Sequence, residues 1–216
     1  MSPINDHIKH LRKDYAQATL SESDVNTNPF KQFEKWFDEA INAQLDEPNA
    51  MTISTVSANG RPSSRIVLLR NFDERGFVFF TNYKSRKAME AKEDSAVALN
   101  FFWQSIERQV RIEGKIEKVS AQESDDYFAS RPRESQIGAW ASAQSETLNS
   151  REDLENQVKL FTDKFKDTTI PRPSHWGGLR IVPDFFEFWQ GRSNRLHDRI
   201  FYSLKNQDWK IGRLNP

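Results

Sequence analysis

The sequence contains no cysteine, which excludes disulfide bonds, thiolate catalysis and cysteine-ligated metal centres and favours a reducing, cytoplasmic environment. It carries no net charge, because 31 Lys and Arg balance 31 Asp and Glu, so no overall field attracts nucleic acid or membrane. No apolar run approaches the roughly 20 residues of a transmembrane helix. The polar N-terminal sequence MSPINDHIKHLRKDY lacks the apolar core of a signal peptide.

Reactive motifs are scarce as well. The four histidines are scattered, and no segment has the pattern of a nucleophile–base pair, a glycine-rich phosphate loop or a metal site. What the chain does have is aromatic and basic residues, with 16 Phe and 6 Trp. Local basic clusters in a neutral chain suit a small anionic ligand, and the aromatic content suits a β-rich core or a site for a flat ring. A cofactor is therefore expected to carry the chemistry.

The periodicity predicts a mainly β protein with added helices (α+β), built as an antiparallel barrel. Residues 1–20 are predicted to be a mobile, partly helical arm and residues 21–216 a single domain. Helices are expected over 28–44, 85–95, 120–131 and 151–165, with Asn28 and Ser120 as N-caps. Strands are expected over 50–57, 63–72, 76–82, 96–103, 108–120, 179–189 and 199–204. Hairpin turns are expected at Asn59-Gly60 and over 190–194, and a rigid loop over 170–178.

Two clusters lie near the predicted strands 63–72 and 76–82. Arg65 and Arg70 frame four apolar residues, and strand alternation would place them on opposite faces. The alternative is that they are the solvated ends of a buried strand. Arg86 and Lys87 follow Ser85 at a predicted helix start, where the macrodipole disfavours cations unless an anion is bound. The alternative there is an exposed charged turn. No acidic residue of the chain is expected to pair with this set, which suggests an external phosphate.

Two more clusters lie in the second half of the chain. Tyr127, Arg131 and Ser135 recur at intervals of four and suit a phosphate monoester, although a helix end closed by a cation would show the same spacing. In FEFWQGRSNRLHDR, a strand over 195–199 would place Arg195, His197 and Arg199 on one face, near Trp189 on the facing strand. Two arginines beside a histidine require an anion or an electron-rich ring in compensation, although a lone histidine on a strand is more often structural.

These segments, in order, resemble the pyridoxine/pyridoxamine 5'-phosphate oxidase family. The resemblance rests on RIVLLR, SRKA, ERQV, RPRESQIGAW, AQS, HWGG, EFWQGRSNRLHDR and the terminal WKIGRLNP, and it covers nearly the whole chain. It implies a split β-barrel homodimer with flavin mononucleotide (FMN) held noncovalently at the dimer interface. It also implies oxidation of pyridoxamine or pyridoxine 5'-phosphate to pyridoxal 5'-phosphate, with O2 as electron acceptor and H2O2 as product.

The resemblance assigns roles residue by residue. Arg195 and His197 would be catalytic, orienting the pyridine ring. The implied FMN contacts are Arg65, Ile66, Val67, Leu68, Leu69, Arg70, Phe80, Thr81, Arg86, Lys87, Gln109, Gln144, Ser145, Trp189 and Arg199. The implied substrate contacts are Arg12 and Tyr15 of a mobile lid segment, Arg70, Tyr127, Arg131 and Ser135 around the phosphate, and Arg195 and His197. No metal ligand is implied.

One position departs from the family pattern: Arg70 stands where lysine is usual, so the charge is kept but reach and geometry change. Two other functions are weighed against the oxidase. A split-barrel flavin or deazaflavin-dependent reductase would not need Tyr127, Arg131, Ser135 and the Arg195/His197 pair. A non-catalytic pyridoxal phosphate binder would not need flavin-ring contacts such as Gln109 and Trp189.

Overall fold

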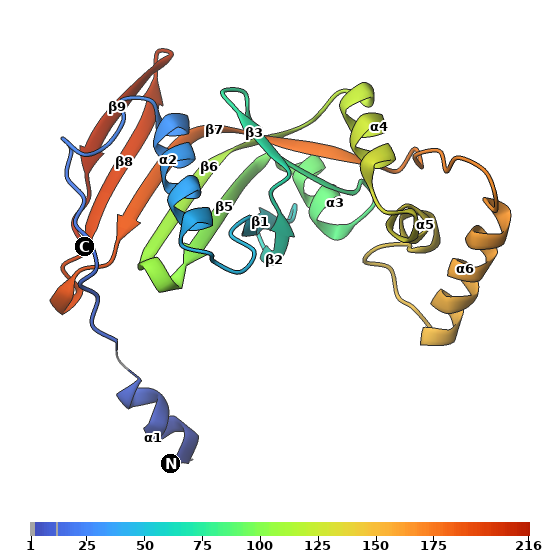
Figure 1. The fold of residues 1–216 in the computed structure, drawn as a ribbon, viewed down its shortest axis with the longest axis horizontal. Helices are drawn as coiled ribbons and strands as arrows, with labels where there is room; N and C mark the ends of the chain where they lie inside the picture. Colours follow the sequence, from blue (N-terminus) through green and yellow to red (C-terminus); the bar gives the residue numbers. More distant parts are fainter. Residues whose placement is uncertain (1–2, 12) are drawn as a thin grey trace. The chain divides into compact units, whose positions relative to one another are not determined.

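The computed structural model describes residues 3–11 and 13–216, which form two compact units. The central unit holds residues 49–99 and 113–184. The terminal unit holds the described residues up to 48 together with 100–112 and 185–216. Helices are added to a sheet whose described strand pairs are antiparallel, which confirms the predicted α+β class (Figure 1). The division into an arm and a single domain over 21–216 stays a prediction.

The central unit is built on the strand order β2-β1-β5-β6-β7-β4-β3. Three of these strands, β5, β6 and β7, are long and also contribute residues to the terminal unit. Helices α4 and α5 pack around a buried cluster centred on Phe128, Ile137 and Trp176. The elements with residues in this unit are β1 (Ala50–Val56), β2 (Pro62–Leu68), β3 (Asn71–Asp73), β4 (Gly76–Asn82), α3 (Arg86–Glu93), β5 (Ala96–Trp103), β6 (Arg108–Lys118), α4 (Ala121–Ser130), α5 (Arg133–Ala141), α6 (Arg151–Lys164) and β7 (Trp176–Gln190).

The terminal unit pairs the end of β7 with β8, and β8 with β9. Helix α2 covers these strands with aromatic side chains: Phe30 lies 5.3 Å from Phe186 and Trp36 lies 5.2 Å from Phe188, ring centre to ring centre. The elements that complete the unit are α1 (Pro3–His10), α2 (Pro29–Asn42), the 3₁₀ turns Gln104–Ile106 and Ser193–Arg195, β8 (Asp198–Lys205) and β9 (Asp208–Arg213). Within the described ranges, none of the helices has the length and apolar character needed to cross a membrane.

Local signals in the sequence account for several element boundaries. Asn28 caps α2 by accepting hydrogen bonds from the backbone N–H groups of Phe30 and Lys31, as predicted. Ser120 and Glu123 form the predicted capping box at the start of α4. Gly60, with φ +79°, lies in the predicted turn between β1 and β2. Each of these motifs needs only neighbours in sequence, which is why the sequence identifies them.

Three expectations about elements were wrong, and two observed elements were not expected. The predicted strand 63–72 is interrupted, because β2 ends at Leu68 and β3 begins at Asn71. The segment 195–197 is not a strand: Asn194 and Arg195 have positive φ in a 3₁₀ turn, and β8 begins only at Asp198. The sequence WGG starts β7 rather than ending a loop, and neither α5 nor β9 was expected.

Candidate functional site: a basic and aromatic cavity

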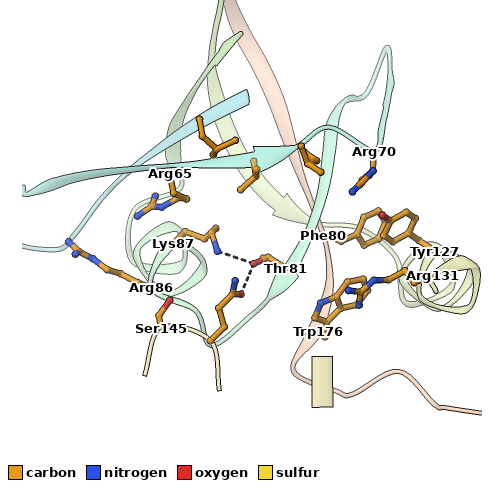
Figure 2. A pocket seen from close by; sticks show the side chains of 14 residues that line it. Arg65, Arg70, Phe80, Thr81, Arg86, Lys87, Tyr127, Arg131, Ser145 and Trp176 are labelled. Carbon is orange, nitrogen blue, oxygen red and sulfur yellow. Dashed lines mark hydrogen bonds between the residues drawn. The ribbon is translucent and has the colours of Figure 1, made fainter. Parts of the chain in front are cut away.

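A cavity of about 630 Å³ lies within the central unit, a size typical of small-molecule sites. Figure 2 shows Arg65, Arg86 and Lys87 at one end and aromatic rings, together with Arg70 and Arg131, at the other. Residues from β2, β4, α3, α4, the loop after α5 and the start of β7 therefore meet here. Its lining residues are Arg65, Ile66, Val67, Leu68, Arg70, Phe80, Thr81, Arg86, Lys87, Tyr127, Arg131, Gln144, Ser145 and Trp176.

Lys87 is the most enclosed cation of this cavity. Its side chain is only 8% exposed, and Nζ donates to Thr81 Oγ1 at 3.1 Å and to Ser85 Oγ at 3.3 Å. Burial, and secondarily the charge of Arg65, lowers the pKa of Lys87. Among the described residues no carboxylate lies within ion-pair distance of Nζ. A bound anion would stabilise the charged form, so this end of the cavity fits a phosphate group.

Glu90 on α3 pairs with the two arginines at the same end. Arg86 Nε donates to Glu90 Oε1 at 2.8 Å, and Arg65 Nη2 lies 3.6 Å from Oε2. The hydroxyls of Thr55 and Ser63 each donate to Oε2 at 2.6 Å. Burial raises the pKa of Glu90, but these hydrogen bonds outweigh it and hold the pKa at about 2. The expectation that no acidic residue pairs with this basic set was wrong for Arg65 and Arg86.

The opposite end of the cavity is formed by stacked rings. Phe80 and Tyr127 lie 3.8 Å apart at an interplanar angle of 15°, and Trp176 lies 5.6 Å from Phe80 at 13°. The guanidinium of Arg131 lies 4.5 Å above the Trp176 ring. Arg131 Nη1 is buried and has no hydrogen-bond partner in the described part of the chain. An unpaired buried donor is costly, so a ligand acceptor would fit this position.

Two more predicted residues, Arg70 and Ser135, lie near the aromatic end, the first in the main cavity and the second in an adjoining one. Arg70 is exposed, lines the cavity and appears beside Tyr127 and Arg131 in Figure 2. Burial is the main cause that lowers the pKa of Arg131, and the charge of Arg70 adds to it. Ser135 lines an adjoining cavity of about 250 Å³, together with Arg131.

The prediction that Arg65 and Arg70 lie on opposite faces of one strand was wrong. Strand alternation predicted opposite faces, but β2 ends at Leu68, so alternation does not extend to Arg70. Both arginines line one cavity, near its opposite ends (Figure 2). Leu69 is buried, with 5% exposure, and is not part of the cavity wall.

Gln144 and Ser145 reach the cavity from the loop that follows α5. Thr81 Oγ1 donates to Gln144 Oε1 at 3.2 Å, and the backbone N–H of Asn82 donates to the same oxygen at 3.4 Å. Ser145 has φ +75°. The loop is thus fixed to the end of β4, beside Lys87, where it lines the cavity.

The remaining predicted residues lie in the terminal unit, so the structure does not place them in the central cavity. The rings of Trp189 and His197 are 4.6 Å apart, and Tyr15 lies 5.8 Å from Trp189. His197 Nδ1 accepts from the backbone N–H of Arg192 at 3.1 Å. Burial, and secondarily Arg195, lowers the pKa of His197, which favours the neutral ring at pH 7.

The other predicted residues of the terminal unit differ in exposure. Arg195 is exposed and Gln109 is half-buried on β6. Arg199 Nε donates to the buried Glu187 at 2.7 Å, and its Nη1 donates to the carbonyl of Asn215 at 2.8 Å. The predicted substrate contact Arg12 lies outside the described residues.

Two residues of the central site were missed. Trp176 was placed in the predicted loop 170–178, but it lies in the same strand, β7, as the apolar residues Leu179 and Ile181 that follow it. Glu90 lies in the predicted helix 85–95 and was not singled out. Its position four residues after Arg86 predicts an ion pair, but the contacts with Thr55 and Ser63 depend on tertiary packing.

The sequence matches two family descriptions. Residues 37–163 match "Pyridoxamine 5'-phosphate oxidase", and residues 176–216 match "Pyridoxine 5'-phosphate oxidase C-terminal dimerisation region". Together these ranges include most of the chain. The second range contains Trp189, Arg195, His197 and Arg199.

Whole-length relatives carry the same name. A pyridoxine/pyridoxamine 5'-phosphate oxidase of Trichormus variabilis is 60% identical, with 97% of this chain and 98% of the relative covered. One of Nostoc punctiforme is 58% identical with the same coverage, and one of Paraburkholderia xenovorans is 54% identical with 97% and 99% covered.

Two solved structures are similar in fold. PhzG from Burkholderia lata 383, in complex with tetrahydrophenazine-1-carboxylic acid, is 30% identical with a TM-score of 0.87, over 93% of this chain and 99% of that one. A pyridoxamine 5'-phosphate oxidase-related, FMN-binding protein from Nostoc punctiforme is 16% identical with a TM-score of 0.70, over 89% of this chain and 100% of that one. The second likeness concerns the fold alone, and it agrees with the expected split barrel.

Proposed function

The chain belongs to the pyridoxine/pyridoxamine 5'-phosphate oxidase family and is an oxidoreductase, and from that premise we propose that it uses FMN and O2 to form pyridoxal 5'-phosphate. Pyridoxamine 5'-phosphate, O2 and water would give pyridoxal 5'-phosphate, ammonia and H2O2. Pyridoxine 5'-phosphate and O2 would give pyridoxal 5'-phosphate and H2O2. The reaction would supply the active form of vitamin B6 in the cytoplasm. The observation that carries the proposal is one cavity with a phosphate-compatible cationic end and a ring-lined, donor-bearing end.

The cationic end is the proposed site of the FMN phosphate. Lys87 is buried beside hydroxyls and has no carboxylate within ion-pair distance among the described residues, so it would contribute a full positive charge. Arg65 and Arg86 would contribute less, because Glu90 already neutralises part of their charge. Ser145 and Gln144 would add hydrogen bonds, and residues 66–68, Phe80 and Thr81 would border the flavin. When bound, FMN supplies a ring that accepts two electrons from the substrate and passes them to O2.

The ring-lined end is the proposed site of the substrate phosphate. Arg131 offers a buried Nη1 without a partner in the described chain, and Arg70 and Tyr127 line the same part of the cavity. Ser135 would contribute its hydroxyl from the adjoining cavity. Two arginines close enough to influence one another favour a dianion between them.

The terminal unit is proposed to contribute the residues that orient the substrate ring. Arg195 and His197 would contact the pyridine ring, while Gln109, Trp189 and Arg199 would contact the flavin. The low pKa of His197 keeps a neutral ring available as a hydrogen-bonding group. Because catalysis of this kind depends on alignment, orientation by these side chains would supply much of the rate. We propose that the protein is a homodimer, with FMN at the subunit interface, which is supported by the match to a dimerisation region.

Replacement of Lys87 tests the FMN assignment. Lys87→Met keeps an unbranched side chain, shorter by one atom, and removes its charge. FMN should therefore bind about 10- to 100-fold more weakly, the scale of a lost charge-assisted hydrogen bond of roughly 1.5–3 kcal/mol. Titration of apoprotein with FMN, followed by flavin fluorescence, measures the affinity. Lys92→Met is the matched control, since Lys92 lies on the same helix, is exposed and is not in the cavity wall. Equal affinity in the two variants would show that the phosphate does not bind at Lys87.

A further inference from the structure

Within the terminal unit, Glu107 holds a short segment of the N-terminal region, residues 13–17. The Glu107 side chain is only 2% exposed, and its Oε2 accepts from the backbone N–H groups of Ala16 at 3.0 Å and Gln17 at 3.1 Å. Oε1 lies 3.8 Å from Lys13 Nζ. A buried carboxylate that accepts two backbone donors makes strong, charge-assisted hydrogen bonds.

The backbone of the same residue holds the start of the turn after β7. The Glu107 carbonyl accepts from the Gly191 N–H at 2.8 Å and from Gln190 Nε2 at 3.2 Å. Glu107 has the left-handed conformation, with φ +57° and ψ +39°, which is unfavourable for a residue with a long side chain. One residue in a strained conformation therefore joins two segments, through its main chain on one side and its carboxylate on the other.

Within residues 13–17, Tyr15 lies against the rings of Trp189 and His197. Tyr15 makes an edge-to-face contact with Trp189 and lies 6.1 Å from the ring of His197. Gly191 leaves the space for it: a Cβ at this position would lie 2.8 Å from Tyr15 Cβ and 2.9 Å from Cγ. The Tyr15 carbonyl also accepts from Ser193 Oγ at 3.2 Å.

We propose that Glu107 is a positioning residue for substrate binding. Its carboxylate holds residues 13–17 so that Tyr15 covers the Trp189–His197 pair, and Gly191 supplies the room that this position of Tyr15 requires. This inference rests on the proposed function, which assigns His197 to the substrate ring. Release of the segment would weaken substrate binding more than FMN binding, because the proposed FMN phosphate site at Lys87 lies in the central cavity.

Three variants distinguish a loss of the position of Tyr15 from a general loss of folding. Glu107→Asn shortens the side chain so that it no longer reaches Ala16 and Gln17, while asparagine tolerates the left-handed conformation and the backbone contacts remain. Gly191→Ala displaces Tyr15 and leaves the carboxylate in place. Glu107→Gln keeps an oxygen that can accept from both N–H groups and serves as the conservative variant.

Steady-state kinetics of the FMN-loaded enzymes with pyridoxamine 5'-phosphate provide the main readout. Glu107→Asn and Gly191→Ala should raise KM by about tenfold and change kcat less than about twofold, as expected for loss of binding common to the ground and transition states. Glu107→Gln should stay within about threefold of the wild-type KM. Unchanged KM in Glu107→Asn, or a fall in kcat without a rise in KM, would overturn the proposal.

Limited proteolysis tests the same contacts without any assay of turnover. Trypsin cleavage after Lys13, followed by mass spectrometry, should be at least about fivefold faster in Glu107→Asn than in the wild type, because local release exposes the backbone. An equal cleavage rate would show that Glu107 does not hold the segment. If the wild type lacks oxidase activity, the proposed function fails, yet this measurement still decides whether Glu107 holds residues 13–17.

Discussion

The cations of the central cavity are not equivalent, and the difference depends on their carboxylate partners. Arg65 and Arg86 share Glu90, whereas Lys87 is surrounded by hydroxyls. Arg70 differs from Lys87, because Arg70 is exposed and lies near another cation, Arg131. A phosphate bound between Arg70 and Arg131 would relieve their repulsion. These contrasts support one anion at each end of the cavity.

Arg70 provides a test at this scale. Arg70→Ala should raise KM for pyridoxamine 5'-phosphate by about 10- to 100-fold, since a charge-assisted hydrogen bond contributes roughly 1.5–3 kcal/mol, while flavin content falls little. Arg70→Lys should recover much of the loss, because a point charge still binds phosphate without the bidentate geometry. Steady-state kinetics and flavin absorbance on purified enzymes measure both effects.

Arg61→Ala is the control for this test, because Arg61 is exposed just before β2 and does not line the cavity. Its KM should equal that of the wild type. Loss of flavin from Arg70→Ala, with an unchanged KM in the remaining holoenzyme, would contradict the assignment of Arg70 to the substrate.

At the scale of elements, hydrogen bonds to Glu90 connect α3 to β1 and β2. Its carboxylate accepts from Thr55 on β1 and Ser63 on β2, and it pairs with Arg86 one turn earlier on α3. The start of α3, which carries Lys87, is thereby fixed beside the strands that line the cavity. The network stabilises the element that positions the phosphate site.

This network predicts a dependence of stability on pH. The folded-state pKa of Glu90 is about 2, below its ordinary value of 4.5. Its stabilising contribution is therefore fully present above pH 4.5 and is lost as the pH falls toward 2. A shift of this size corresponds to about 3 kcal/mol. The free energy of unfolding, measured by chemical denaturation, should fall by about that much more in the wild type than in Glu90→Gln across this window. Parallel profiles for the two proteins would contradict the prediction.

The sequence predicts the elements whose signals are local, such as α2 with its Asn28 cap and α4 with its capping box. It also identifies most of the cavity lining, through the family resemblance. It does not predict the break after Leu68. It also does not predict that the turn expected over 190–194 continues through Arg195, so that β8 begins only at Asp198. Glu90 and Glu107 were missed because, apart from Arg86, the partners of their carboxylates lie 25 to 94 residues away in sequence.

At the scale of the whole molecule, the proposed site residues fall in two units, and the homodimer remains a proposal supported by the dimerisation region over 176–216. Light scattering of the purified yellow protein should report twice the 25.2 kDa of one chain, with about one FMN per chain. The reason is that a site assembled at a subunit interface requires the second subunit. A flavin-loaded monomer at micromolar concentration would contradict it.

The central claim is that this chain oxidises a phosphorylated pyridine compound by means of FMN, and an anaerobic mixing experiment tests it most directly. The FMN-loaded protein is mixed with excess pyridoxamine 5'-phosphate in the absence of O2, and the flavin absorbance is followed. The account predicts rapid bleaching, formation of pyridoxal 5'-phosphate in an amount equal to the flavin, and recovery of the yellow colour with release of H2O2 when O2 is admitted. A flavin that stays oxidised under saturating substrate would contradict the account.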